Sequence, residues 1–573
     1  MFFLCRKLFP GMILWSYLLF PVLNSPLYGA QPDAGQLLRE QQPQRQLPQR
    51  TILPEKEREK EFRASGAGVK ILVKSYRFTG FESLVQESEL QKLLADTIGK
   101  ELNYDELKGQ LVRIDNYLKK NGWILAESYL SEQDVNSGLI EIRLSRSVSD
   151  GNMVFNRNKR VRLCPGVLSG IGSDAVQSGQ AINERKLERS LLLINDLPGM
   201  SANALLDYGA VQGAKKVVVD VAEGSLLTGA VWEDNYGNYF TGRQRSSAMV
   251  NINDATGCGD QLSIIGTLSD GLRIGKLYYA YPLGSNGLKA NISYSQMSYK
   301  MLRELSELHV KGQGQIFDAG LSYPLVRSRL SNVTASGLFE YKSLSDTILG
   351  VDISDTSVNS YTLGLKGDFF DQFLGEGYNT WNLSVTGGTV NEGVADLSLS
   401  GSQGGFDYAK MGLNRLQSIS RQVNLNLSWS AQFASGNLHS SEKFCLGGPY
   451  GVRAYPIGEA SGDAGHLFNV DLRFKLPVPA EYGTVQLSGF YDAGRITTHV
   501  NPWPYSILTA TGKNQYWLQG FGVEVQYIYS GRLNLKGTWA HVIGENPGRN
   551  FWGNNSELKS DSDRFWLVAT LFF

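Results

Sequence analysis

The sequence predicts an all-β transmembrane barrel of about sixteen antiparallel strands, preceded by two small α+β domains and a short N-terminal helix. Segments of alternating apolar and polar residues fill the chain from Leu226 onward, as expected of strands with two different faces. Two tandem units with one order of strands and helices precede them. Beyond residue 30 no apolar stretch reaches the roughly 20 residues that a membrane-spanning helix needs.

Composition argues against a nucleic-acid partner and favours a large β structure. The 573 residues hold 55 Lys and Arg against 55 Asp and Glu, whereas binding to a phosphate backbone requires a basic excess. The chain carries 63 Gly, 27 Tyr and 25 Phe but only 8 Met. Many glycines and aromatic residues are typical of long strands joined by many turns.

Residues 1–30 have the layout of a signal peptide. Arg6 and Lys7 form a basic start, an apolar run extends from Met12 to Leu23, and small residues follow at Gly29-Ala30. The alternative is a short membrane anchor, but the run is too short for a span. We therefore expect a leader that is removed on export.

Residues 31–69 are rich in Gln, Pro, Arg and Glu. A short polar helix is predicted within residues 31–50, over Ala34 to Leu47, and a flexible linker within residues 51–69. Composition by itself favours a disordered tail over the helix.

Residues 70–149 read as strand, helix, helix, strand, strand. Apolar residues recur at helical spacing from Glu87 to Ile98 and again from Tyr104 to Leu118. Asn121-Gly122 ends the second helix. Strands are predicted over Trp123 to Tyr129 and Leu139 to Leu144.

Residues 150–223 repeat this order more loosely. A strand begins at Met153, and Glu184 to Ile194 is an amphipathic helix that stops before Pro198-Gly199. Ala202 to Leu206 and Lys216 to Val221 are predicted strands. Two units of about 75 residues with a shared βααββ order form an internal repeat.

Residues 224–573 alternate with a period of two. Val423, Leu425, Leu427 and Trp429 interleave with Asn424, Asn426, Ser428 and Ser430. A soluble sandwich alternates as well, but these segments approach the 9–11 residues of a tilted transmembrane strand. Connections also alternate in length, as in outer-membrane barrels. Short ones lie at 254–259, 327–331, 418–422 and 530–531, and long ones at 391–406, 437–465, 496–513 and 542–562.

The sequence carries no recognisable catalytic, metal or cofactor motif. The five His are scattered, and no metal-binding, phosphate-binding or nucleophile motif is present. Beyond the leader, Cys164, Cys258 and Cys445 are odd in number and far apart. We expect no enzyme activity, no cofactor, no metal and no disulfide framework.

One constellation does indicate a functional site. The longest loop holds Arg453, and a later strand holds Phe490 and Asp492, whose alternation places both in the lumen. A carboxylate inside a barrel needs a partner, and an arginine from an inward-folded loop would supply it. The alternative is a pair of ordinary exposed charges, which the spacing alone favours.

These residues carry a resemblance to a known family. The chain resembles the outer-membrane transporters of two-partner secretion (TpsB, or hemolysin secretion/activation proteins) of the Omp85 superfamily. The family's Val-Arg-Gly-Tyr loop motif is matched by Val452, Arg453, Ala454 and Tyr455, with Ala in place of Gly, and its Phe-x-Asp-x-Gly motif by Phe490, Asp492 and Gly494. Further similar stretches are 122–138, 187–199 and 234–243.

The resemblance implies an architecture and a function. Residues 70–149 and 150–223 would be two periplasmic POTRA domains, 31–50 a helix that plugs the pore, and Arg453 with Asp492 a lock between loop and barrel. The partner would be an unfolded exoprotein of TpsA type, exported without ATP through an outer-membrane, lipid-embedded pore. Added strands would bind at POTRA edges near Leu125, Ala126 and Tyr129 and near Ala202 and Leu206.

Two other readings compete with this one. An assembly factor that inserts other barrels shares the loop and strand motifs, but such factors usually carry three to five POTRA repeats. A passive porin or uptake barrel would not need tandem repeats at all.

Overall fold

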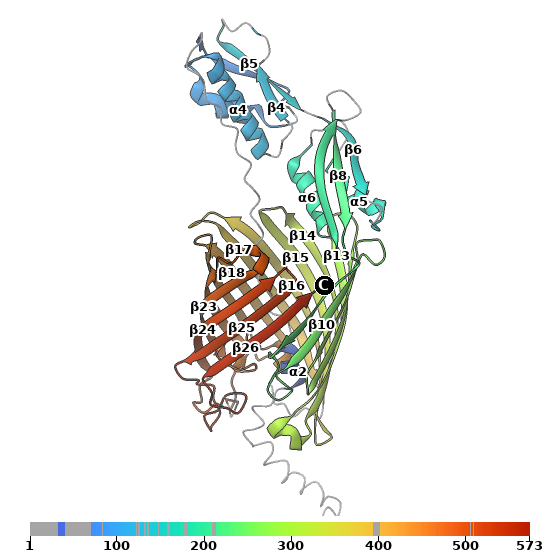
Figure 1. The fold of residues 1–573 in the computed structure, drawn as a ribbon, viewed down its shortest axis with the longest axis vertical. Helices are drawn as coiled ribbons and strands as arrows, with labels where there is room; N and C mark the ends of the chain where they lie inside the picture. The colour runs from blue at the N-terminus through green and yellow to red at the C-terminus, as the bar shows by residue number, and fades with distance from the viewer. Residues whose placement is uncertain are drawn as a thin grey trace, which may run out of the picture.

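The computed structural model describes residues 33–40 and 70–573, apart from 83, 122, 124–125, 131–132, 134–136, 147, 158–160, 174, 177–181, 209–213, 394–400, 505 and 508. Two α+β units stand in a row at one end of a barrel (Figure 1). Among the described helices, none has the length and apolar character needed to cross a bilayer. The predicted leader (1–30) and linker (51–69) lie outside the described residues.

The first α+β unit contains a three-stranded sheet in the order β2-β5-β4. β2 and β5 are parallel, whereas β4 and β5 are antiparallel. Helix α4 begins with a capping box between Asn103 and Glu106, which satisfies two backbone N–H groups that a helix start leaves free. The elements are β1 (Ile71–Leu72), β2 (Ser75–Thr79), α3 (Glu87–Leu94), β3 (Glu101–Leu102), α4 (Tyr104–Lys120), β4 (Ala126–Leu130) and β5 (Leu139–Arg146).

The second α+β unit repeats this topology with a sheet in the order β6-β8-β7. Its outer pairs are again one parallel and one antiparallel. Apolar residues of both helices pack on one sheet face and form the core. The elements are β6 (Val148–Arg157), α5 (Pro165–Gly172), α6 (Glu184–Asn195), β7 (Met200–Tyr208) and β8 (Ala214–Glu223).

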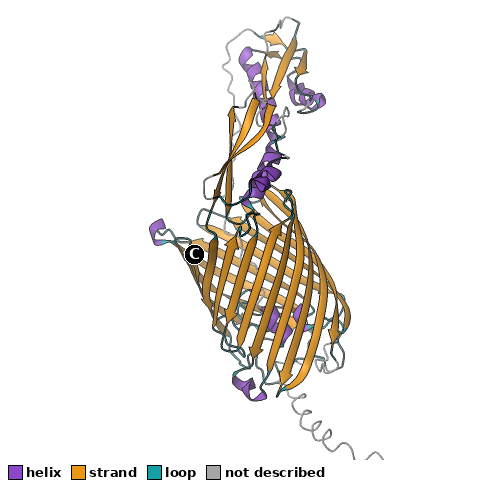
Figure 2. Cartoon of the chain, turned by 90° about the vertical axis from the view of Figure 1, so that its right-hand side faces the viewer, coloured by secondary structure: helices purple, strands orange, loops and turns teal. Residues whose placement is uncertain are grey.

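The barrel strands are antiparallel. The barrel is closed, because its last strand pairs with its first. Figure 2 shows the tilted strands wrapping around a lumen that contains a short helix. The prediction of about sixteen strands is confirmed. They are β9 (Leu227–Asp234), β10 (Arg245–Asn253), β11 (Gln261–Leu268), β12 (Leu272–Pro282), β13 (Lys289–Lys300), β14 (Lys311–Arg327), β15 (Ser331–Ile348), β16 (Val351–Asp371), β17 (Gly377–Glu392), β18 (Gly404–Ser418), β19 (Val423–Ala434), β22 (Ala464–Lys475), β23 (Thr484–Thr497), β24 (Gln515–Tyr529), β25 (Leu533–Ile543) and β26 (Asp563–Phe572).

Several strands are longer than the sequence analysis expected. β15 has 18 residues and β16 has 21, about twice the 9–11 that cross a bilayer. Side chains of a strand continue to alternate between its two faces where the strand leaves the lipid. The alternation therefore does not show where the membrane ends. These strands therefore extend the barrel wall beyond the membrane.

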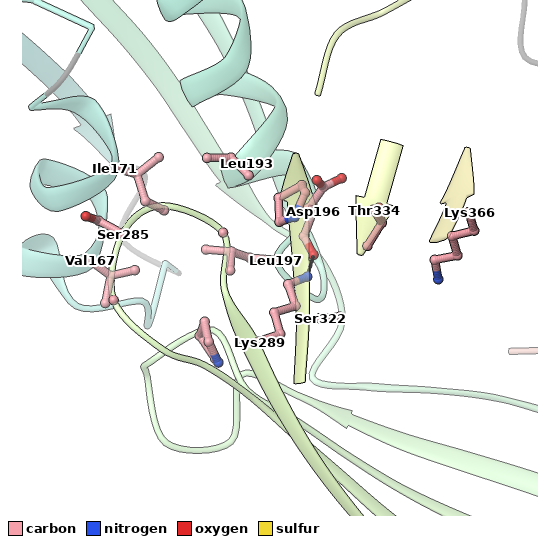
Figure 3. Close-up of a pocket in the computed structure, with 14 residues that line it drawn as sticks. Val167, Ile171, Leu193, Asp196, Leu197, Ser285, Lys289, Ser322, Thr334 and Lys366 are labelled. Atoms are coloured by element: carbon pink, nitrogen blue, oxygen red, sulfur yellow. Dashed lines mark hydrogen bonds between the residues drawn. The ribbon is translucent and has the colours of Figure 1, made fainter. Parts of the chain in front are cut away.

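The second unit is fixed to the barrel mouth by charged side chains. Asp196, just beyond α6, accepts two hydrogen bonds from Arg327 at the end of β14, both of 2.8 Å. Arg189 donates to the carbonyl oxygen of Pro324 at 2.8 Å. Figure 3 shows Asp196, Leu193 and Leu197 lining a pocket that Val167 and Ile171 of α5 also line, at the ends of the barrel strands. A bidentate pair fixes the relative orientation of its two groups as well as their distance. The second unit therefore has a defined orientation on the barrel.

Candidate functional site: a loop bonded to the inner barrel wall

The site is built on the long loop between β19 and β22. A tight turn returns this loop on itself, with the N–H of Val452 donating to the carbonyl oxygen of Leu446 at 2.7 Å. Gly451 is required there, since a Cβ would stand 1.8 Å from the Leu446 oxygen. The turn presents the Arg453 side chain to the inner faces of β22 and β23.

Arg453 and Asp492 are brought together by the fold. The guanidinium donates to both carboxylate oxygens, from Nε at 2.9 Å and from Nη2 at 2.7 Å. The backbone N–H of Arg453 donates to the same carboxylate at 3.0 Å. Asp492 is fully buried and Arg453 is 8% exposed, so these are not ordinary surface charges. Each charge depends on the other in a site that water scarcely reaches.

Further groups that the sequence analysis did not assign complete the arrangement. Asp471 on β22 accepts a bond of 2.8 Å from Arg453 Nη2. Asn469 donates to Asp492 at 2.8 Å and to the carbonyl oxygen of Gly451 at 3.1 Å. Burial lowers the pKa of Arg453, but the bonds to Asp492 and Asp471 outweigh it and hold the pKa above its ordinary value. The guanidinium therefore stays charged.

Aromatic groups hold the loop on two further sides. The Arg453 guanidinium carbon lies 3.4 Å from the ring centroid of Phe490, within the range of a cation–π contact. Trp566 on β26 donates from Nε1 to the Arg453 carbonyl oxygen at 2.7 Å. Because β26 is the closing strand, the loop is bonded to the barrel seam as well as to β22 and β23.

The neighbours of Arg453 in its motif form a small buried core. Val452, Ala454 and Tyr455 pack with Phe490 in one apolar cluster and are at most 2% exposed. Gly494 lets the loop approach β23, since a Cβ there would lie 2.5 Å from Leu446 Cδ2. All predicted residues of the loop-to-barrel contact thus meet in one place.

Ala454, which departs from the family motif, lies against a glycine of strand β24. A Cβ at Gly520 on β24 would lie 2.5 Å from the Ala454 Cβ. We expect Gly520→Ala to destabilise the seated loop by about 1–3 kcal/mol through overpacking. Adding Ala454→Gly should restore much of this loss. The Cβ added at position 520 would still lie 3.1 Å from the His541 carbonyl oxygen. Protease sensitivity of the loop measures the effect; an additive double mutant would contradict the pairing.

A second luminal contact joins the N-terminal helix to the same loop. Helix α2 (Ala34–Glu40) lies inside the barrel, where Ala34 and Leu37 are fully buried against residues of β12 to β15. The N–H of Ala34 donates to Asp346 at 3.2 Å. Gly35 packs on the short helix η4 (Ser440–Glu442) of the loop. The remainder of the predicted segment 31–50 lies outside the described residues.

The two strands predicted to pair with the exported partner lie at the edges of the two small sheets. β4 carries Ala126, which is buried, and Tyr129, which is 45% exposed. β7 carries Ala202, which is buried, and Leu206 on its backbone. Leu125 lies outside the described residues. Within the described part of the chain no group of His, Cys, Asp and Glu is placed to hold a metal ion.

A closed sixteen-strand barrel, an inward loop bonded to its wall and tandem α+β units at its mouth together define an outer-membrane transport barrel. Comparison with known proteins narrows the class. Residues 196–512 match the model of the haemolysin secretion/activation protein family ShlB/FhaC/HecB, and residues 71–147 match the ShlB-type POTRA domain.

Relatives and solved structures agree with this match. The heme/hemopexin transporter protein HuxB of Haemophilus influenzae (strain 86-028NP) is 25% identical over 96% of both chains. CdiB from Escherichia coli has a similar structure, with a TM-score of 0.71 and 20% identity over 96% of this chain and 98% of that one. BamA from Haemophilus ducreyi lacking POTRA domains 1–3 gives a TM-score of 0.50 at 13% identity, over 88% and 100%.

The chain belongs to the haemolysin secretion/activation family, since the family model covers more than half of it. It is an outer-membrane pore that secretes a partner protein, with its POTRA units in the periplasm. The likeness to BamA shows a shared fold alone.

Proposed function

We propose that the pore exports an unfolded exoprotein, recognised through an N-terminal secretion segment that adds as a strand to a POTRA edge. The observation that supports this most is the content of the lumen. Helix α2 and the loop are both held there by side-chain contacts, with α2 seated against the wall and η4. A plug held in this way can leave as a unit while the wall stays closed.

Translocation then requires no nucleotide. The exoprotein displaces α2, threads the polar lumen past the loop, and folds outside, which prevents its return. Arg453 and Asp492 keep the loop on the wall during passage. Lipid surrounds the exposed apolar residues on the outer barrel face, such as Leu363 and Val385.

The test compares the culture medium of cells with and without this chain and follows outer-membrane porin levels in parallel. We expect one large exoprotein to disappear from the medium while porins stay constant. An unchanged medium with falling porins would instead indicate an assembly factor, the second function compatible with this fold.

A further inference from the structure

In the second α+β unit, a side chain from helix α6 occupies the position that a neighbouring strand would take beside the edge strand β7. Asn195, the last residue of α6, donates from Nδ2 to the carbonyl oxygen of Ala202 at 3.1 Å. It also accepts the N–H of Ala202 on Oδ1 at 2.7 Å. One amide thus fills both outward hydrogen-bonding positions of Ala202, as a paired peptide would.

Beyond Ala202 the outward side of this edge continues toward Tyr208. Ala202 pairs with Val221 of β8 on its other side, so by alternation Ala204, Leu206 and Tyr208 also present their N–H and C=O groups outward. Among the described residues, none bonds the outward groups of Ala204. β4 differs: it has only five residues, and Asp115 of α4 accepts the N–H of its middle residue, Ser128, at 2.8 Å. β7 therefore offers the longer edge.

Side chains on the solvent face of this sheet form rows that run across the strands to β7. A polar row holds Asn156 and Asp220, bonded at 3.0 Å, and ends at Asn203. The next row is apolar; it holds Val154 and Val218 and ends at Leu205, which is 61% exposed. The third pairs Lys216 with Asp207, whose carboxylate is 54% exposed at the edge. A strand added to β7 would continue each row.

The end of β7 that Asn195 occupies is also the end nearest the barrel. Asp196, the next residue, is labelled in Figure 3 and is held by Arg327 of β14. Asn195 is thus fixed where the sheet edge meets the barrel mouth. A strand paired with Ala204 to Tyr208 would stop there, at the barrel mouth.

We propose that β7 receives the exported chain, that Asn195 ends the added strand at Ala202, and that the bound segment is polar, apolar and basic at the alternate positions beside Asn203, Leu205 and Asp207. This assignment rests on the proposed function and specifies which edge, register and sequence pattern it uses. Main-chain pairing provides binding, and the three rows provide selectivity.

The first experiment measures export of the exoprotein that disappears from the medium when this chain is deleted. Ala204→Pro removes an outward N–H and leaves the ladder to β8 intact, so we expect export to fall about fivefold or more. Ala204→Ser keeps the N–H and should export normally. Leu205→Lys alters the apolar row without entering the core and should also reduce export. This variant tests the edge assignment if the proline variant fails to fold.

The second experiment maps the end of the added strand with a photo-crosslinking side chain at position 205 or 201. In the native background we expect crosslinks to the exoprotein from 205 and none from 201. With Asn195→Ala, both positions should crosslink, because nothing ends the strand at Ala202. Equal crosslinking from both positions in the native background would overturn the role of Asn195. Normal export by Ala204→Pro and Leu205→Lys would overturn the edge assignment, while loss of export on deletion would still support the proposed function.

Discussion

Replacing Arg453 with alanine is expected to reduce export by about tenfold or more while the barrel still assembles, because losing one partner of a buried ion pair costs about 3–5 kcal/mol. The change removes the side-chain bonds to Asp492 and Asp471. It leaves Asp492 fully buried without its cation. The barrel wall does not depend on this pair, since it is held by strand pairing around the whole circle.

Graded variants separate the contributions within this site. Arg453→Lys keeps the charge but loses the planar bidentate contact, so an intermediate defect is expected. Asp492→Asn should be more severe than Asp471→Asn, because Asp492 accepts three bonds from Arg453 and Asp471 accepts one. Arg495→Ala, an exposed arginine on the same strand, is the matched control. Equal export by Arg453→Ala and the control, at equal outer-membrane levels, would contradict the assignment.

Alternation and loop length were sufficient to predict the barrel. Lipid selects apolar side chains at every second position of a strand, and this signal survives without any knowledge of strand partners. The same alternation placed Phe490 and Asp492 in the lumen, and the family resemblance supplied their link to the loop. The second α+β unit was predicted more loosely, because the glycine-rich helix α5 (Pro165–Gly172) has only a weak apolar stripe.

The luminal contacts beyond this pair could not be predicted from the sequence. Alternation shows that Asp471 faces the lumen but not which residue of the next strand lies beside it, since that depends on register. The need for glycine at position 520 is visible only once Ala454 is in place. The buried pair of Lys342 and Glu442 joins residues a hundred positions apart, with no motif to mark either one.

Replacing Gly35 with valine is expected to keep helix α2 out of its seat and to open the pore. A Cβ at Gly35 would lie 2.3 Å from Ser440 Oγ and 2.8 Å from the backbone nitrogen of Ser441. The serine hydroxyl can rotate away, but a backbone nitrogen can move only if η4 moves. Either η4 shifts or the helix leaves, and the surroundings of η4 decide which.

Helix η4 is held to the barrel wall by charged and polar side chains. Glu442 forms a buried ion pair with Lys342 of β15 and accepts a hydrogen bond of 2.8 Å from Tyr408 of β18. Its carbonyl oxygen accepts from Gln432 of β19 at 2.9 Å. On α2, the N–H of Ala34 donates to Asp346, and Ala34 and Leu37 pack in an apolar cluster. Moving η4 would break a buried charge pair, so α2 should yield.

The measurement is single-pore conductance in planar bilayers, with uptake of a large hydrophilic antibiotic by intact cells as a second readout. Gly35→Val should shift the pore to a predominantly open state, and Gly35→Ala should have a smaller effect in the same direction. Gly166→Val is the matched control, because a Cβ at that helical glycine would meet nothing within 4 Å. Native conductance by Gly35→Val would mean that η4 moves and α2 stays in place. Adding Glu442→Gln to Gly35→Val should then leave the conductance unchanged. An open pore in Gly35→Val with η4 still protected from protease would show that the loop remains seated while the plug leaves, so that passage of the exported chain requires release of α2 alone.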